Sequence, residues 1–428
     1  MSVAPQIPHY ERRHSRWYER LLLGLPFQFL LGSVCLYLLP LGLLAPEYLA
    51  LPGPEQSLTP ISLVGAYLLS LFFLSRLRVY PGAHSLAHIL PTVSLAWFLV
   101  IAVILLCNQP LHWQWHLYGF VAACLWSGAA IFVGRRFRTQ KIAVVPSAAT
   151  EQLQSTLFYR FHTLAEPDFA GRRFDAVVAD LHADLSPRWQ RFLAHATLNR
   201  IPVYHIKQLN ESITGRVRIN HLSENEFGSL QPSPAYEALK RLIDLTIVLV
   251  TAPLWLVLML LIALGIKLDS PGPVLFIQER VGQGGRPFNI CKFRSMRPDA
   301  EQQGQRLACS GDERITRLGR LLRRTRLDEL PQFFNVLKGE MSLIGPRPEQ
   351  SVFVERFERE IPFYAYRHVV KPGITGWAQV MQGYTADSET TRIKIEHDFY
   401  YIKHFSLWVD LLIVLRTLRV ILTGFGAR

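Results

Sequence analysis

Four long apolar stretches separated by short polar segments dominate the first third of the chain. They lie near residues 20–44, 61–79, 86–107 and 117–134. As a helix, about 20 apolar residues cross the ~30 Å hydrocarbon core of a bilayer. Arginine and lysine gather before the first stretch, between the second and third, and after the fourth. Because cytosolic loops carry the excess of positive charge, residues 1–139 are predicted to form a four-helix transmembrane bundle with both ends in the cytosol.

A fifth apolar run, residues 240–267, has a proline at its centre and basic residues at both ends. Its only acid is Asp244, and Pro253 divides it into two arms. Proline bends a helix sharply, and two arms of about ten residues each reach about 15 Å, half of the bilayer core. A crossing would also place Lys240 and the basic region after Lys267 on opposite sides, against the positive-inside tendency. We therefore expect a re-entrant membrane hairpin, with a proline-kinked spanning helix as the alternative.

Residues 140–230 have a soluble composition and a different periodicity. Short apolar runs at 142–145, 176–179 and 201–206 are accompanied by a helical pattern over 187–199. This alternation is typical of a small α/β domain with a parallel sheet. The turn after the first run contains no G-x-G-x-x-G motif. The sequence predicts a Rossmann-like domain without a dinucleotide site, for which docking or self-association is the expected role.

Two basic amphipathic segments follow within residues 231–428. Arginines alternate with leucine and isoleucine over residues 314–324, and an apolar stripe runs over residues 407–422. Both patterns fit helices that lie in the headgroup plane. An ordinary half-buried helix is the alternative for the first segment, and a fifth spanning helix for the second. With the hairpin, they predict a mainly helical, monotopic domain, so the expected fold class is membrane α combined with α/β.

The charge of the chain narrows the classes of partner. The 428 residues carry a formal net charge of +13, although half of them are apolar. Such a balance suits a membrane protein that contacts anionic headgroups or phosphate-bearing substrates. A nucleic-acid partner would explain the charge but not the long apolar runs, so we expect none.

An adjacent acidic pair, Asp328 and Glu329, directly follows the arginine-rich segment. Thr325, three residues ahead of Asp328, permits a simple interpretation as a capping box at a helix start. The nearby arginines favour a second interpretation, in which positive charge holds a carboxylate ionised. Such a carboxylate could bind a divalent cation or attack a phosphoryl centre. Adjacent side chains on a helix diverge, so we expect different roles for the two acids.

Two rigid loops further along carry groups suited to phosphate or nucleotide contact. In the first, residues 343–348, a glycine and two prolines bracket Arg347. A guanidinium fixed in this way suits bidentate contact with phosphate oxygens. The second, residues 371–379, combines two glycines with Trp377, which we expect to be exposed for contact with a nucleotide or a headgroup.

In this order, the segments resemble the bacterial sugar transferase family, the monotopic polyprenyl-phosphate phosphoglycosyl transferases. The four preceding helices and the α/β region resemble the larger members of that family. The resemblance covers essentially the whole chain, but its motifs are concentrated after residue 239. The matching stretches are residues 240–244, the Pro253 hairpin, and residues 276–282, 292–296, 327–330, 334–342, 345–348, 372–379 and 398–401.

The resemblance implies transfer of a hexose 1-phosphate from a UDP-sugar to undecaprenyl phosphate, with release of UMP. This step initiates the repeat units of exopolysaccharide, capsule or O-antigen. It further implies that Asp328 attacks the β-phosphorus to form a phosphosugar-aspartyl intermediate, and that Glu329 assists in metal or acceptor handling. Mg²⁺, with Asp328 as a ligand, would offset the diphosphate charge.

Other positions that match the family are expected to bind phosphate or to lie near the site: Lys292, Arg294, Arg323, Arg347 and Asp398. The resemblance also implies a multi-pass protein of the bacterial inner membrane, in contact with its lipids. Its catalytic domain would lie on the cytoplasmic face, and two copies would form a homodimer.

Two departures from the family pattern affect these expectations. The hairpin break usually reads Ser-Pro, whereas this chain has Ala252 before Pro253, so a serine-mediated backbone hydrogen bond is missing. Residues 380–384 replace an Asn-Gly-Arg-like loop, so contacts there cannot be transferred. Two other functions stay open as alternatives. A direct glycosyltransferase predicts a D-x-D metal motif, which the sequence lacks, and a non-catalytic membrane sensor or scaffold predicts that Asp328 is dispensable.

Overall fold

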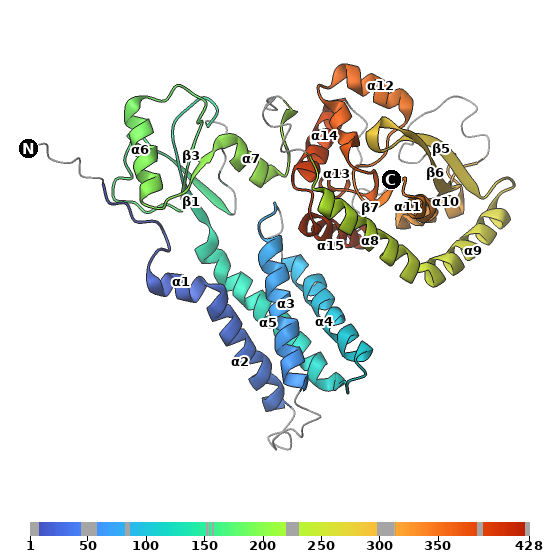
Figure 1. The fold of residues 1–428 in the computed structure, drawn as a ribbon, viewed down its shortest axis with the longest axis horizontal. Coiled ribbons are helices and arrows are strands. Elements are labelled where there is room, and N and C mark those ends of the chain that lie inside the picture. The colour runs from blue at the N-terminus through green and yellow to red at the C-terminus, as the bar shows by residue number, and fades with distance from the viewer. Residues whose placement is uncertain are drawn as a thin grey trace, which may run out of the picture. The chain divides into compact units, whose positions relative to one another are not determined.

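The computed structural model describes residues 8–43, 58–81, 86–150, 153, 155, 158–219, 231–297, 312, 314–382 and 388–423. The chain divides into two compact units, Met1–Thr214 and Gly215–Arg428. It is mostly helical, with candidate membrane helices in both units and a small parallel sheet in the first (Figure 1).

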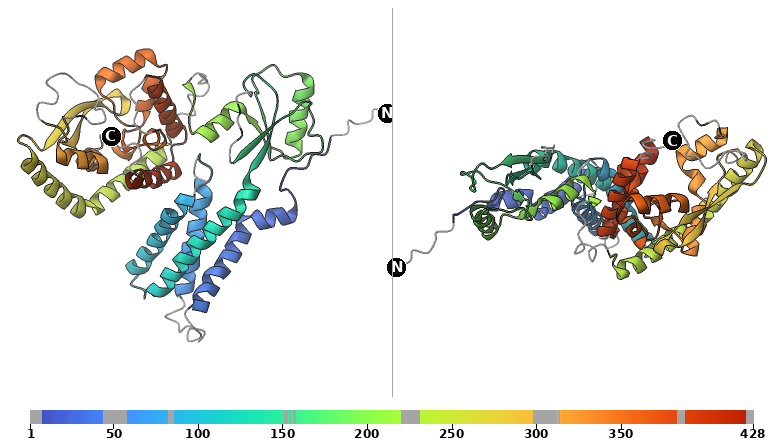
Figure 2. Two further views of the ribbon diagram at one scale, coloured as in Figure 1. Left: turned by 180° about the vertical axis from the view of Figure 1, so that it is seen from behind. Right: turned by 90° about the horizontal axis from the view of Figure 1, so that it is seen from above.

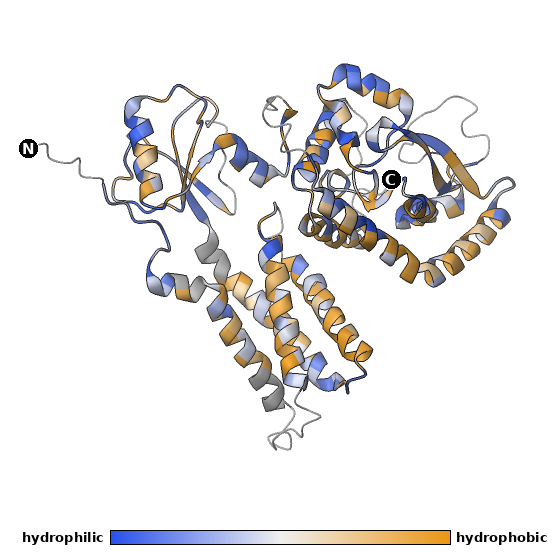
Figure 3. Cartoon of the chain, viewed as in Figure 1, coloured by the Kyte–Doolittle hydropathy of each residue, from blue (hydrophilic) through white to orange (hydrophobic). Residues whose placement is uncertain are grey.

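The predicted apolar helices of the first unit are present. The helices are α1 (Trp17–Leu23), α2 (Leu25–Leu43), α3 (Leu58–Leu77), the short 3-10 helix η3 (Leu86–His88), α4 (Ile89–Leu106) and α5 (Trp113–Arg138). By length and composition, α3, α4 and α5 can each cross a membrane, and α2 has described apolar side chains over Leu25–Leu36 (Figure 3). The expected first helix is divided, because Gly24 is extended and Pro26 begins a new helix in its first turn, where a missing amide costs little.

The second part of this unit is the predicted parallel α/β domain. Its elements are β1 (Gln140–Val144), β2 (Tyr159–Thr163), β3 (Ala176–Ala179), α6 (Pro187–Leu198), β4 (Val203–His205) and α7 (Ile206–Thr214). The sheet has the order β2-β1-β3-β4, and all three pairings are parallel. All four residues of β3 are buried, as expected for a central strand with two covered faces.

The second unit contains mainly helices and two small sheets. Its elements are α8 (Pro234–Val250), α9 (Ala252–Asp269), β5 (Leu275–Val281), η6 (Gln283–Gly285), β6 (Pro287–Phe293), α10 (Arg317–Thr325), η7 (Leu327–Glu329), α11 (Gln332–Lys338), β7 (Ser342–Ile344), α12 (Ser351–Glu360), η8 (Tyr364–Val369), β8 (Gly373–Thr375), α13 (Trp377–Met381), α14 (Ser388–Lys403) and α15 (Leu407–Thr423). Strands β5 and β6 form an antiparallel pair, whereas β7 and β8 are parallel.

The run around Pro253 forms two helices, α8 and α9, which make an open V (Figures 1 and 2). Thr251 is the single residue between them, and its hydroxyl donates to the carbonyl of Ile247 at 2.7 Å. The indole of Trp255 donates to the carbonyl of Val248 at 2.9 Å. These side chains satisfy carbonyls at the break, where proline supplies no amide. The break therefore forms without a serine at position 252.

Two expectations about this run are wrong. The arms have 17 and 18 residues rather than about ten, because α8 begins at Pro234 and α9 extends to Asp269. Lys240 is not a membrane flank either: it is buried and pairs with Asp410 at 2.6 Å. One face of α8 packs into the unit. Arg241, the residue after Lys240, donates to two carbonyls near the end of α11.

Helix α9 is exposed on most of its surface, and leucines make up much of that surface. Leu254 is 75% exposed and Leu268 is 81% exposed. The opposite face holds Ile262 and Ile266, which pack with Leu322 of α10. The arginine-rich helix α10 is therefore half-buried. Its location in the headgroup plane stays a prediction. Among the described helices, α15 does not reach the length and hydropathy of a membrane span.

Candidate active site

The acidic pair lies in a single 3-10 turn between two helices. Helix α10 ends at Thr325, and Arg326 then adopts a left-handed conformation with φ 61°. The turn η7 follows and carries Asp328 and Glu329. The hydroxyl of Thr325 donates to the carbonyl of Leu321 within α10, so the capping-box interpretation is wrong. Leu327 and Leu330, on either side of the acidic pair, are partly buried and pack against the apolar core beside α9.

A buried amide connects this turn to the neighbouring sheet. Asn335 of α11 accepts from the amide of Cys291 at 3.1 Å and donates to the carbonyl of Asn289 at 2.7 Å. Both partners belong to β6, and Asn335 is fully buried. Strand β6 is thereby fixed against α11, which places Lys292 beside the acidic pair.

Glu329 is buried and surrounded by cations. Its Oε1 lies 2.6 Å from Arg347, 3.4 Å from Lys292 and 3.8 Å from Arg326. Burial alone would raise the pKa of Glu329, but the charges of Arg347, Lys292 and Arg326 outweigh it and lower the pKa. Glu329 is therefore an ionised anchor for these three side chains.

Asp328 has a contrasting environment. Its Oδ1 is buried and has no hydrogen-bond partner among the described residues. Burial and the adjacent charge of Glu329 raise the pKa of Asp328, and the charges of Lys292, Arg347 and Arg323 offset this only in part. The prediction that neighbouring cations hold a carboxylate ionised therefore applies to Glu329 and not to Asp328. A carboxylate oxygen without a partner, next to cations, is suited to receive a phosphorus atom or a metal ion.

The loop that carries Arg347 is held by one donor for each successive carbonyl. The carbonyl of Pro346 accepts from the amide of Gly373 at 2.9 Å, and that of Arg347 accepts from Arg367 at 2.8 Å. The carbonyl of Pro348 accepts from Arg280 at 3.2 Å. The carbonyl of Glu349 accepts from the amide of Val281 at 3.0 Å. Because the two prolines restrict the backbone and all four carbonyls are satisfied, the direction of the Arg347 side chain is fixed.

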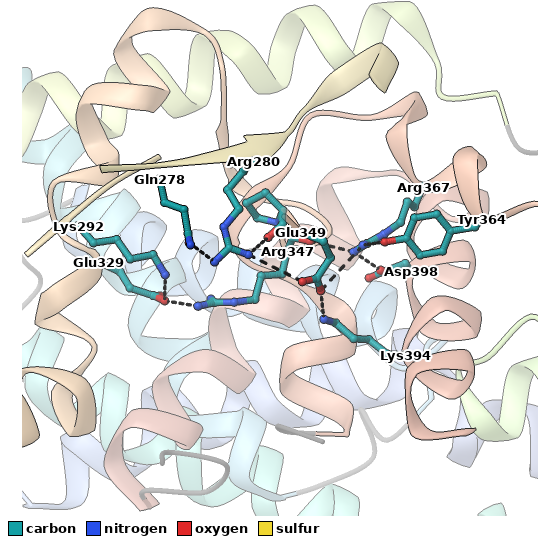
Figure 4. A network of polar contacts seen from close by, with 11 residues as sticks. Gln278, Arg280, Lys292, Glu329, Arg347, Glu349, Tyr364, Arg367, Lys394 and Asp398 are labelled. Carbon is teal, nitrogen blue, oxygen red and sulfur yellow. Dashed lines mark hydrogen bonds and ion pairs between the residues drawn. The ribbon is translucent and has the colours of Figure 1, made fainter. Parts of the chain in front are cut away.

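A second polar network lies behind this loop (Figure 4). Arg367 is 3% exposed and donates to Asp398 at 2.9 Å and to the hydroxyl of Tyr364 at 2.8 Å. Glu349 pairs with Lys394 and lies 3.9 Å from Arg280 and 4.0 Å from Arg367. These cations lower the pKa of Glu349 although its burial opposes them. The network joins α14, η8 and β5 to the Arg347 loop.

The candidate residues from sequence do not all meet at one place. Lys292, Arg347 and Glu329 are in direct contact, and the charge of Arg323 acts on Asp328. Asp398 does not contact these side chains directly but is connected to the Arg347 loop through Arg367. Arg294 is engaged elsewhere, because its guanidinium donates to Ser270 and Pro271 after α9.

The expectation of an exposed Trp377 is wrong. The indole is 1% exposed, donates to the carbonyl of Gly215 at 2.8 Å and stacks on Tyr400. The guanidinium of Arg416 lies over the indole ring, with its central carbon 4.9 Å from the ring centroid. Of the departure at residues 380–384, positions 383 and 384 lie outside the described residues.

Sequence reasoning missed the members of the second network: Arg280, Glu349, Arg367 and Lys394. Glu349 could have been identified from the sequence, since it directly follows the Pro-Arg-Pro turn. Arg280 lies within residues 276–282, which match the family, but no role was assigned to it there. Arg367 and Lys394 lie on other elements, and nothing near them in sequence distinguishes them from solvated surface charges.

Comparisons with known proteins identify the family of the chain. The family model described as bacterial sugar transferase matches residues 235–424. The chain is 50% identical over 427 residues to a UDP-N-acetylgalactosamine-undecaprenyl-phosphate N-acetylgalactosaminephosphotransferase from Aeromonas hydrophila, covering 98% of this chain and 100% of the relative. It is 46% identical over 204 residues to a UDP-glucose:undecaprenyl-phosphate glucose-1-phosphate transferase from Caulobacter vibrioides, which is 47% of this chain and 76% of the relative. A protein of the same name from Escherichia coli is 48% identical over 158 residues, 36% of this chain and 34% of the relative. With its full length matched at this level of identity, the chain belongs to the bacterial sugar transferase family.

Proposed function

We propose that this protein transfers a sugar 1-phosphate from a UDP-sugar to undecaprenyl phosphate, releases UMP, and so initiates a polysaccharide repeat unit. The observation that carries the proposal is the buried Oδ1 of Asp328, which has no described partner and lies within the influence of Lys292, Arg347 and Arg323. The full-length similarity to a transferase of this kind supports it.

Asp328 acts as the nucleophile in two steps. One of its carboxylate oxygens attacks the β-phosphorus of the UDP-sugar, and the bond from that phosphorus to the bridging oxygen breaks, so that its electron pair leaves with UMP. An oxygen of undecaprenyl phosphate then attacks the same phosphorus. The bond between phosphorus and Asp328 breaks, the carboxylate returns, and undecaprenyl diphosphate sugar is formed.

The cations around Glu329 stabilise the charge that develops in both steps. Arg347 and Lys292 are held by Glu329 in fixed positions, so they need no reorganisation when the phosphoryl group arrives. The negative charge of Glu329 is compensated by these cations, and its carboxylate stays ionised. Its role is to position cations, which differs from the role of Asp328.

A Mg²⁺ ion fits this site as one held jointly by protein and substrate. The described residues contain no group of three His, Cys, Asp or Glu side chains that could hold a metal. Mg²⁺ usually takes one or two carboxylates and completes its shell with substrate phosphates and water, and the unpartnered oxygen of Asp328 suits that arrangement. When bound, the ion would offset the diphosphate charge and favour departure of UMP.

The V of α8 and α9 supports a re-entrant hairpin that keeps the site at one membrane surface. Glu237, which precedes the apolar run, accepts a hydrogen bond at 3.0 Å from Gln283, which follows it. Asp244 also accepts from Ser342 of β7 at 2.6 Å. Both ends of the run are therefore bound to the same body. A shared cytosolic surface lets a soluble donor and a lipid acceptor meet at Asp328.

We predict that cysteines placed at Ser233 and Asn289, both exposed and on either side of the V, react with an impermeant maleimide from the same side of the membrane. The measurement uses a background in which the five native cysteines are replaced. A cysteine in the exposed Gln109 position, between α4 and α5, serves as the control for the opposite side. Labelling of positions 233 and 289 from opposite sides would remove the hairpin.

The donor sugar can be tested with a panel of UDP-sugars. Because the full-length relative is named for N-acetylgalactosamine, we expect UDP-N-acetylgalactosamine to give the fastest UMP release with undecaprenyl phosphate, at least about tenfold above UDP-glucose. Release of UDP instead of UMP would indicate a direct glycosyltransferase. No release from any donor would favour the sensor or scaffold.

A further inference from the structure

The segment before α1 crosses one edge of the parallel sheet. The amide of Tyr10 donates to the side chain of Asn199 at 3.2 Å, close before β4. The amide of Arg13 donates to the carbonyl of Phe174, close before β3, at 3.1 Å. The Arg13 guanidinium donates to the carbonyl of Thr139, directly before β1. The segment therefore follows the amino ends of three strands, opposite to the carboxyl edge where open α/β sheets bind nucleotides.

A cavity of about 560 Å³ lies between this segment and the sheet edge, and its charge is predominantly positive. Arg12, Arg13 and Arg200 line it, together with Glu11 and Asp175. The two acids are occupied, because Asp175 pairs with Arg13 and Glu11 with Arg173. Among the described residues, Arg12 and Arg200 have no carboxylate partner. The cavity is thus lined by two exposed arginines that have no carboxylate partner among the described residues.

Backbone strain gathers at the same cavity. Arg200 has φ 59°, and His14, which also lines the cavity, has φ 56°. Side chains with a Cβ rarely adopt this left-handed conformation, and such residues concentrate at ligand sites, where surrounding contacts maintain them. Two of the six described non-glycine residues with positive φ therefore face one small region.

The cavity is expected to lie at the outer limit of the lipid headgroup layer. The apolar window of α5 ends at Val133, and Thr139, directly after the last residue of the helix, is six residues further on. Thr139 is therefore about 9 Å beyond the apolar window. The headgroup layer on each side of the hydrocarbon core is about 5–8 Å thick. Arg13 reaches Thr139 and lines the cavity, which places the opening near the outer limit of that layer.

From this charge and this level, we propose that the cavity binds the phosphate of an anionic glycerophospholipid, with Arg12 and Arg200 as its cationic contacts. Guanidinium groups form charge-assisted, bidentate hydrogen bonds with phosphate oxygens. A lipid bound there would hold the α/β domain and the segment before α1 against the bilayer. The residues that line the cavity all belong to the first unit and the acidic pair to the second, so we expect the transfer reaction not to require the cavity.

Purified full-length protein in detergent, titrated with phosphatidylglycerol and examined by native mass spectrometry, tests the proposal. We expect Arg12→Gln/Arg200→Gln to weaken retention of phosphatidylglycerol at least about tenfold, since each contact is a charge-assisted hydrogen bond. The matched control is Arg188→Gln/Arg191→Gln, which removes the same charge from exposed positions of α6 outside the cavity. This control should retain the lipid as the unmodified protein does. Melting temperature and UMP release should be unchanged in both variants.

Three outcomes would overturn the proposal. Equal loss of phosphatidylglycerol from both double variants would indicate that the lipid is attracted by the overall positive charge of the surface. Equal retention in all three proteins would mean that the cavity does not hold the lipid. If millimolar inorganic phosphate or UMP binds the cavity variant more weakly than the control, while phosphatidylglycerol binds both alike, the ligand is a soluble anion.

Discussion

Asp328→Asn is expected to abolish the burst of UMP that the protein releases when it meets its UDP-sugar without undecaprenyl phosphate. An amide oxygen is too weak a nucleophile to displace UMP, so the loss should be about 10⁴-fold or more. The same variant should yield no phosphosugar adduct at residue 328 by mass spectrometry of the donor-treated protein. A burst of normal size in this variant would place the nucleophile at another side chain.

The same substitution is expected to stabilise the protein at neutral pH, which separates a chemical defect from a folding defect. Burial and Glu329 raise the pKa of Asp328 in the folded state above that in the unfolded chain. The folded state thus binds this proton more tightly, so Asp328 lowers stability progressively as the pH rises above the unfolded-chain pKa of about 4. The full cost is present above the raised pKa of about 6. Asparagine removes that cost, by about 1–3 kcal/mol. The higher melting temperature should be present at pH 8, shrink as the pH falls through about 6, and disappear below about 3, where the carboxyl group is protonated in both states.

Asp312→Asn is the matched control. This carboxylate also lies in the basic region, but it pairs with Arg314 at 2.6 Å, which lowers its pKa. The control should keep the UMP burst and should not raise the melting temperature at pH 8. A gain in stability for both variants would indicate relief of general charge, not of the buried carboxylate at position 328.

Long-range patterns in the sequence predicted most of the fold. Apolar stretches gave α3, α4 and α5, and buried runs gave β1, β3 and β4. Strand β2 was missed, because Tyr159–Thr163 alternates aromatic and polar residues on an edge strand and contains no continuous apolar run. The central position of Pro253 in its apolar run predicts two short arms. In the structure this proline lies in the first turn of a long helix, α9, where it does not limit the length of the helix.

The site was predictable only where its chemistry is concentrated in sequence. Adjacent acids at 328 and 329 and a proline-bracketed Arg347 stand out in any reading. The opposite pKa shifts of Asp328 and Glu329 cannot be predicted from the sequence, because they depend on which of the two carboxylates the cations contact. Arg294 and Trp377 carried the right chemistry for ligand contact, but packing engages both within the domain.

The support behind Arg347 gives the second large effect. Arg347→Gln is expected to lower kcat/KM about 10²–10³-fold, because it removes a preorganised cation from the transferring phosphoryl group. Arg367→Lys should lower kcat about tenfold or more with little change in KM. Lysine keeps the charge, but it cannot donate at once to the Arg347 carbonyl, Asp398 and Tyr364 as the guanidinium does. Arg356→Lys, at an exposed pair on α12, should leave both parameters unchanged.

The double variant distinguishes positioning from general stability. If Arg367 acts by fixing the Arg347 loop, then once Arg347 is replaced, the second substitution has little left to disturb. Arg347→Gln/Arg367→Lys should therefore lose about as much kcat/KM as Arg347→Gln alone, a strong departure from additivity. Additive losses would mean that Arg367 acts independently of Arg347. If kcat falls in parallel with the fraction of folded protein, Arg367 contributes to stability and not to the position of Arg347. The comparison uses active-site titration by the UMP burst, which counts only folded, competent molecules.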